Sequence, residues 1–438
     1  MSRSGQIEIK NIKNKYYAYY TLNIWDKRNK REIKKTRYLG RLDNGNIVIN
    51  QKFVVPDRAL QYGDIAAIMT LNRQSLDKID NIFDKYNNEI KALALIIALY
   101  KSPLGYSRYY YKRSILSLIW PRLKIMNNNI SYVLRYLSRK RDKFENLMEI
   151  KEDMLLLHIE ISIISQIEEK NEFNVVILDI LIDAISLNII NSDYITDKFY
   201  NIEKFINMTR SVNNGGVLIL ESGFNTPKNI QKLMKNNINF IIEGNENDII
   251  KIKNRFKMEK IILYRDYNEL LKKSIFFSEK RIGKLLYYIF YEGNEDVDFI
   301  EFKKVRNLKM AISNLDINHN LIYQAINLRN FIDRIVSYSK FRLYSDSVYW
   351  IDSRAIDGYV IINTIALNFY LSFFRHSTFI HPGRMSYIES LLLELSSVNA
   401  FIIKDDIYIS KIPGELRRKM ETIDESINLD AYREIIKR

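Results

Sequence analysis

Carboxylates interrupt or end several strongly apolar stretches of this 438-residue chain. Asp179 and Asp183 lie inside the run 175–187, and Glu221 ends the run 216–221. Burying a carboxylate is unfavourable unless a cation or hydrogen bonds compensate, so these acids require an explanation. Oxygen ligands are what Mg²⁺ prefers, and two such ions about 3.5–4 Å apart can clamp the attacking and leaving oxygens of a phosphodiester. The acids therefore suggest metal-assisted phosphoryl transfer.

A third acid, Asp333, is expected on a helix over residues 318–340. Arg329 and Asp333 are four residues apart and share one helix face, and Lys340 follows about two turns later. In this arrangement the acid can hold a metal while the cations hold neighbouring phosphates. The same spacing also fits an ordinary surface ion pair that contributes less than about 1 kcal/mol.

Composition narrows the class of partner and of site. The net charge is +15, which favours a polyanionic partner, with nucleic acid ahead of a membrane surface. Cysteine is absent and there are four histidines, which excludes thiolate nucleophiles and leaves a hard, oxygen-bound metal. No apolar leader begins the chain, and the apolar runs 92–100 and 358–374 are expected to be buried helices. We therefore expect a soluble, cytoplasmic protein.

Residues 1–60 are predicted to form a small basic β-module. They hold 14 Lys and Arg against five Asp and Glu, and they alternate apolar and polar residues around a charged hairpin tip at 26–31. The residues expected to contact DNA in this module are Lys27, Arg28, Lys34, Lys35 and Arg37. The alternative is an edge hairpin whose lysines only block aggregation.

Residues 61–170 have the 3.6-residue periodicity of helices and are predicted to form a helical DNA-binding segment. Within it, the stretch 106–113 mixes tyrosines with Arg108, Lys112 and Arg113. Aromatic rings can stack on bases while cations neutralise phosphates. Packed tyrosines with snorkelling cations explain the same stretch equally well.

Residues 171–375 alternate strands and helices. Strands are expected at 175–187, 216–221 and 238–242, with helices between them and an N-cap at Thr226 before Pro227. Open α/β sheets bind ligands at strand ends, where these acids stand. We expect an insertion around 244–305, and a C-terminal extension over 376–438 that contains a strand pair.

Several motifs resemble one family. Arg329, Asp333 and Lys340 reproduce the spacing of a Tyr-(2)-Arg-(3)-Glu-(6)-Lys signature, and the sequence resembles the DDE transposases of insertion sequences that carry it. Other segments resemble the same family in the same order: Trp25-Asp26-Lys27 with Tyr38-Leu39-Gly40, Leu220-Glu221-Ser222-Gly223-Phe224, Ile312 to Asp316, and Val348-Tyr349-Trp350 with Ile356 to Tyr359. The resemblance therefore covers nearly the whole chain.

The resemblance implies an α/β plus α protein with an RNase H-like catalytic core, helical flanking regions and a small N-terminal β-module. It implies a cut-and-paste transposase that cleaves and joins double-stranded DNA, at element ends and at the target, with two Mg²⁺ or Mn²⁺ ions. The first acid falls on Asp183 or Asp179, the second on Glu221 and the third on Asp333, while Arg329 and Lys340 become phosphate contacts. A homodimer in the synaptic complex, a nucleoid-associated location and no membrane partner are also implied.

The chain departs from the family pattern in ways that leave a second reading open. The acids read Asp, Glu, Asp instead of Asp, Asp, Glu, and Ser222 replaces an Arg after the second acid. Ile326 occupies the Tyr position of the signature. The interval between Asp183 and Glu221 is short, so the second and third core strands are expected to be stunted or lost. The alternative is a catalytically inactive or domesticated DNA-binding protein derived from a transposase.

Overall fold

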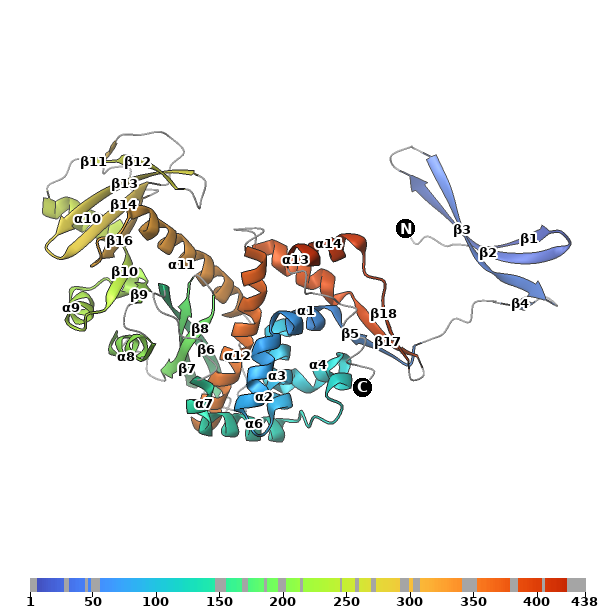
Figure 1. The fold of residues 1–438 in the computed structure, drawn as a ribbon. Coiled ribbons are helices and arrows are strands. Elements are labelled where there is room, and N and C mark those ends of the chain that lie inside the picture. The colour runs from blue at the N-terminus through green and yellow to red at the C-terminus, as the bar shows by residue number, and fades with distance from the viewer. Residues whose placement is uncertain are drawn as a thin grey trace. The chain divides into compact units, whose positions relative to one another are not determined.

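A computed structural model of the chain provides the fold (Figure 1). It describes residues 6–26, 31–43, 46–48, 56–145, 155–167, 172–184, 187–195, 202–212, 216–244, 246–256, 260–268, 273–291, 299–301, 308–340, 353–378, 385–403 and 406–423. The chain divides into one unit of residues 1–58 with 401–408, and a second of residues 59–400 with 409–438.

The first unit contains a four-stranded antiparallel sheet in the order β1-β2-β3-β4. Its strands are β1 (Gln6–Ile12), β2 (Lys15–Asp26), β3 (Arg31–Asp43) and β4 (Asn46–Val48). Lys13 and Asn14 both have positive φ, the conformation of a two-residue turn whose twist matches the flanking strands. The predicted β-structure of this region and its hairpin are confirmed, because Asp26 pairs with Arg31 across the tip.

The second unit begins with helices. These are α1 (Gly63–Leu71), α2 (Arg73–Ile82), α3 (Asn87–Tyr100), the 3-10 turn η1 (Leu104–Tyr106), α4 (Ser107–Arg113), α5 (Leu116–Ile119), α6 (Asn127–Arg139) and α7 (Arg141–Glu145). A long helix near the C-terminus, α12 (Ser353–Thr378), packs against α3 and α6. Gly358 allows this contact, since a Cβ there would meet the Leu134 carbonyl oxygen at 1.9 Å. The helical prediction is confirmed as far as Glu145.

Residues 155–167 are a strand, so the prediction of helix over residues 61–170 is wrong near its end. The stretch places Ile159, Ile161 and Ile163 at every second position, and β-branched residues in alternation favour a strand over a helix. This strand, β6, is an internal strand of a nine-stranded sheet, between β9 and β7.

The sheet has the order β12-β13-β14-β16-β10-β9-β6-β7-β8. Its strands are β6 (Leu155–Ile167), β7 (Glu172–Asp183), β8 (Ile189–Ile195), β9 (Val217–Leu220), β10 (Asn239–Gly244), β12 (Tyr264–Asn268), β13 (Lys273–Ile282), β14 (Leu285–Tyr291) and β16 (Leu308–Ser313). Strands β6, β7 and β8 form an antiparallel meander. Strand β9 then runs parallel to β6, and β10 runs parallel to β9. The second and third core strands, predicted to be stunted or lost, are therefore present.

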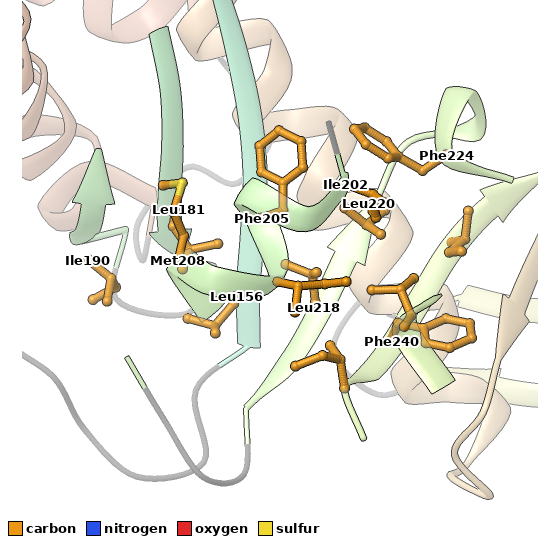
Figure 2. Close-up of a cluster of buried hydrophobic side chains, with 14 residues drawn as sticks. Leu156, Leu181, Ile190, Ile202, Phe205, Met208, Leu218, Leu220, Phe224 and Phe240 are labelled. Carbon is orange, nitrogen blue, oxygen red and sulfur yellow. The ribbon is translucent and has the colours of Figure 1, made fainter. Parts of the chain in front are cut away.

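Helices α8 (Ile202–Val212) and α9 (Pro227–Lys235) make the two crossovers to the parallel strands. They bury one face of the sheet, where Phe205 of α8 lies among Leu156, Leu218 and Leu220 (Figure 2). The predicted start of α9 is confirmed, because the Thr226 hydroxyl accepts a hydrogen bond from the Asn229 N–H at 3.2 Å.

Helix α11 (His319–Lys340) contacts β6, β9 and β10. Leu157, Ile219 and Ile241 alternate with the residues facing α8 and α9, and they are at most 1% exposed. Since side chains alternate along a strand, α11 covers this opposite face.

The predicted insertion around 244–305 contains both helix and strand. It comprises α10 (Glu246–Phe256), the paired short strands β11 (Lys260–Ile262) and β15 (Phe299–Glu301), and strands β12 to β14. Strand β16 returns antiparallel to β10 and pairs with β14, so β12, β13 and β14 extend the same sheet, whereas β11 and β15 form a separate pair. The insertion is thus continuous with the core.

The C-terminal part contains α13 (Met385–Ser396), β17 (Asn399–Ile403), β18 (Asp406–Ile409) and α14 (Gly414–Ile423). A three-stranded sheet has the order β18-β17-β5, where β5 is Arg58–Gln61. In the described part of the chain, one helical window, Arg354–Arg375 in α12, is long and apolar enough to span a membrane, but 83% of it is buried inside the protein. That burial is typical of a core helix and is consistent with a soluble protein.

Candidate functional site

Two carboxylates meet where the parallel strands β9 and β10 end. Glu221 directly follows β9, and Glu243 lies near the end of β10. Leu220 is paired with Ile242, so Glu221 and Glu243 occupy the next positions of neighbouring strands. Both follow the alternation of Ile219 and Ile241 and therefore face α11.

Helix α11 adds Arg329 and Asp333 to these acids. The Arg329 Nη2 atom lies 3.0 Å from the Asp333 Oδ2 atom and 3.5 Å from the Glu221 Oε2 atom. The Nη1 atom of the same guanidinium lies 3.5 Å from the Glu243 Oε2 atom. We call Glu221, Glu243 and Asp333 the carboxylate cluster.

Arg329 is the buried member of this group, being 4% exposed. Three carboxylates share its single positive charge, so the cluster retains an excess of negative charge. Burial raises the pKa of Glu243, although the charges of Arg329 and Lys309 act in the opposite direction. The Arg329 Nε atom has no hydrogen-bond partner among the described residues. Binding of an additional cation at the carboxylate cluster would therefore be electrostatically favourable.

The predicted first acid is not brought to this cluster. Asp183 pairs with Leu156, which is in register with Leu218, three residues before Glu221. Asp183 is therefore separated from Glu221 by roughly 10 Å along the strands and roughly 10 Å across them. It also follows the alternation of Leu181, which places it on the face covered by α8 and α9.

Asp179 is likewise positioned away from Glu221. It pairs with Glu160 of β6 and with Asp193 of β8. The run that contains Asp179 and Asp183 was interpreted from the sequence as the first core strand, but it is the second strand of the meander. Continuing the β6–β9 register by two residues brings Ile159 beside Glu221, so β6 offers no acid at that point.

Glu243 is the site residue that the sequence analysis missed. The signal was present, since the apolar stretch Phe240-Ile241-Ile242 ends on this carboxylate just as the preceding strand ends on Glu221. Two consecutive parallel strands that end in this way place both acids at one edge of the sheet.

The donor chemistry of the carboxylate cluster fits a hard divalent cation. Its oxygens come from three adjacent elements, and Mg²⁺ and Mn²⁺ prefer such ligands. Among the described residues no three acidic or histidine side chains are already grouped closely enough to hold an ion. The guanidinium of Arg329 lies between the acids, so a metal would draw them away from that cation.

The predicted DNA contacts of the helical segment lie on α4. Arg108, Lys112 and Arg113 are exposed, as are Tyr106 and Tyr109. The Arg113 Nη1 atom donates to the Tyr109 hydroxyl at 2.8 Å, and its guanidinium lies 5.1 Å from the centre of that ring. These five side chains form an accessible surface of cations and rings.

The other tyrosines of this segment are structural. Tyr111 is buried and donates to the Trp120 carbonyl oxygen at 2.5 Å, while Tyr110 stacks on Tyr100 with ring centres 4.4 Å apart. The packing interpretation of the stretch 106–113 is therefore confirmed for Tyr110 and Tyr111, while DNA contact by the exposed residues stays a prediction.

The remaining predicted contacts are only partly described. Lys34 is exposed on β3 and forms an ion pair with Glu8 of β1. Lys35 and Arg37 also lie on β3, where only their backbone is described. Lys340 is the last residue of α11, and its side chain lies outside the described part. Lys27 and Arg28 lie outside the described residues altogether.

Comparisons with known proteins add no relative. A scan against protein-family models finds no match for this chain, and a search of the curated proteins finds no significant match.

Proposed function

We propose that this protein is a DNA transposase of the DDE type, with an RNase H-like core that performs metal-assisted phosphoryl transfer on double-stranded DNA. The observation that carries the proposal is the topology around the acids. Three antiparallel strands are followed by two parallel strands reached through helices, in the order β8-β7-β6-β9-β10. An acid ends the fourth strand, and a helix after the insertion brings Asp333 to it. The segments that resemble transposase motifs occur along the chain in the same order as these strands and helices.

In this proposal the carboxylate cluster supplies the metal ligands. Glu221, Glu243 and Asp333 would hold one or two Mg²⁺ or Mn²⁺ ions in place of the predicted set that included Asp183 or Asp179. A bound divalent ion would stabilise the charge that develops on the phosphate oxygens and activate the attacking oxygen. The buried strands β9 and β10 fix two of the three ligands on rigid backbone, and α11 fixes the third.

Arg329 has a second role in the proposed reaction. Its planar guanidinium can bind a phosphate through two parallel hydrogen bonds, a geometry that the ammonium group of a lysine does not provide. When a metal neutralises the acids, Arg329 would turn from Glu221 and Asp333 toward the DNA phosphate at the cleavage point. The net charge of +15 and the exposed cations of α4 would hold the flanking duplex. Pairing of two DNA ends by a homodimer, in a nucleoid-associated cytoplasmic protein, belongs to the same proposal.

The test is nicking of supercoiled plasmid in Mg²⁺ and in Mn²⁺. Wild type should nick, and Asp333→Ala should not, while both proteins bind DNA with the same affinity. Glu415→Ala serves as the control, because Glu415 is an acid on α14 whose side chain is 82% exposed. Absence of nicking by folded, DNA-bound wild type in both metals would overturn the enzymatic proposal. Joined strands among the products would separate a transposase from a nuclease.

A second candidate is a DNA-binding protein that no longer cleaves. Two observations favour it, namely the guanidinium of Arg329 between the acids and the placement of Asp183 on the opposite face of the sheet. This candidate predicts salt-dependent DNA affinity that does not respond to Mg²⁺ or to Asp333→Asn.

A further inference from the structure

The two faces of the N-terminal sheet differ in chemistry. The β1–β2 register pairs Lys10 with Tyr17 and Glu8 with Tyr19, whereas the alternate positions pair Ile7 with Tyr20 and Ile9 with Ala18. The β2–β3 register extends these two alternating sets of residues to β3, because directly paired residues point to the same face. We call the first the tyrosine–lysine face, formed by Lys10, Tyr17, Tyr19, Lys34, Tyr38 and Arg41. We call the second the isoleucine face, formed by Ile7, Ile9, Tyr16 and Tyr20, with Lys35 and Arg37 at its register positions.

The tyrosine–lysine face is an ordered platform. The ring of Tyr38 lies 6.1 Å from that of Tyr17 and 5.4 Å from that of Tyr19. The Lys10 ammonium lies 5.0 Å from the centre of the Tyr19 ring. The two β2 rings are half-buried, so their positions are held by neighbours across three strands. Little side-chain entropy would be lost when a ligand settles on this face.

Cations surround that platform. Lys10, Lys34 and Arg41 are all exposed, and the pairing of Lys34 with Glu8 leaves the other two charges in excess. On the isoleucine face, by contrast, Ile7 and Ile9 are 57% and 59% exposed. Lys35 and Arg37 occupy register positions of this face as well, so the two faces differ in the ordered rings around their cations and not in the presence of cations.

We propose that the tyrosine–lysine face is the surface with which the N-terminal sheet binds duplex DNA, and that Lys10 and Arg41 contact its phosphates. The inference rests on the proposed function, because it assigns the DNA contact of that function to one face. It adds Lys10 and Arg41, which the sequence analysis did not single out. It also removes Lys35 and Arg37 from the contact surface, although they were predicted to bind DNA. At Tyr17 the sheet is four strands wide, because Lys10, Tyr17, Arg41 and Val48 follow one another across it, so this face would lie against the duplex backbone, where cations meet phosphates.

The register provides a matched pair of variants. Lys10→Ala with Arg41→Ala removes two positive charges from the tyrosine–lysine face, and Lys35→Ala with Arg37→Ala removes two from the other face of the same sheet. Binding of the full-length variants to a fluorescent mixed-sequence duplex of about 30 base pairs, roughly three helical turns, is measured by anisotropy over a series of salt concentrations. Circular dichroism and thermal unfolding check that each variant is folded.

The first pair should weaken binding at least tenfold and lower the salt dependence by about one to two counterions. The second pair should change affinity less than twofold. Equal weakening by both pairs, or a larger effect of Lys35 and Arg37, would overturn the assignment while leaving DNA binding itself intact. Absence of duplex binding by wild type would instead overturn the proposed function, and the face assignment with it. Should the first pair fail to fold, Lys10→Gln and Arg41→Gln as single changes keep side-chain length and make the same comparison.

Discussion

The Arg329 Nη2 atom lies 3.0 Å from the Asp333 Oδ2 atom, one helical turn away on α11. The same nitrogen approaches Glu221 from the end of β9, so one buried cation joins the helix to the sheet. The i, i+4 spacing alone describes a weak surface ion pair. Because Arg329 is buried, however, loss of this pair should destabilise the protein much more than loss of a surface pair. Removing one partner of a buried ion pair leaves an uncompensated charge, which is far more unfavourable than losing an exposed pair.

Arg329→Met should therefore destabilise the protein by about 3–5 kcal/mol at neutral pH, because the carboxylate cluster loses its counter-cation. Added Mn²⁺ should restore more stability to this variant than to wild type, since the acids would then hold the metal without competition. Urea unfolding with and without Mn²⁺ measures both effects. Arg334→Ala, at an exposed position of the same helix, is the control. A variant as stable as wild type would contradict the counter-cation role.

Asp64 gives the protein a pH dependence. Burial raises its pKa from 3.8 to about 6, and the side chain is 4% exposed in α1. Between these two values the folded state keeps a proton that the unfolded state has lost. The free energy of unfolding therefore falls as pH rises through this window and stays lower above it. Asp64→Asn should remove this loss, which amounts to about 3 kcal/mol.

Urea unfolding at pH 4 and pH 7 tests the Asp64 prediction. Relative to wild type, the free energy of unfolding of Asp64→Asn should be higher at pH 7 than at pH 4. Asp77→Asn, at an exposed position of α2, should show no such change. A parallel pH profile for wild type and Asp64→Asn would show that Asp64 is not the titrating group.

Gly358→Ala should destabilise the protein although alanine normally favours a helix by about 1 kcal/mol over glycine. The new Cβ would overlap the Leu134 carbonyl oxygen on α6 and force the helices apart. We expect a loss of about 1–3 kcal/mol from overpacking, visible as a lower melting temperature. Gly414→Ala is the matched control, because no heavy atom lies within 4 Å of its added Cβ. Equal melting temperatures for the two variants would contradict the close helix contact.

Thr226→Ala should lower stability by about 1 kcal/mol, because the N-cap hydrogen bond to the Asn229 N–H is lost. Thr226→Ser keeps the hydroxyl and should stay near wild type. Helix α9 connects the strands that carry Glu221 and Glu243, so fraying should also lower plasmid nicking under the proposed function. Thermal unfolding and the nicking assay of both variants measure the two effects. If the Ser variant is as unstable as the Ala variant, the hydroxyl is not the stabilising group.

Local signals were enough to predict much of the core. The alternation of strands and helices, the cap at Thr226 and the carboxylate at Glu221 all depend on residues close together in the sequence, and the structure agrees with each. The helix that carries Arg329 and Asp333 was predicted from its periodicity in the same way. The presence of an acid at the end of β9 could therefore be predicted from local sequence alone.

The position of the first acid could not be predicted in this way. The segment of β6 was read as helix, so the run containing Asp183 was taken for the first strand of the sheet when it is the second. Because of this error of one strand, Asp183 lies about two strand spacings from Glu221 and on the opposite face of the sheet. Successive side chains of a strand point to opposite faces, so the face of an acid depends on its exact position in the strand. The contact of Glu243 with Arg329 depends on pairing between segments 86 residues apart, which no local pattern contains.

Strand β10 acquires its second neighbour late in synthesis. It can pair with β9 as soon as residue 244 has emerged, but its other partner, β16, is encoded after the whole insertion. At about 5–20 residues per second, the roughly 65 residues between Gly244 and Met310 take about 3–13 s to appear. During that time the apolar edge of β10 is open to pairing with other nascent chains. Excising the insertion would bring β16 directly after β10 and cover this edge early, but it would remove β14, the other partner of β16, so we expect the exposed edge to move to β16.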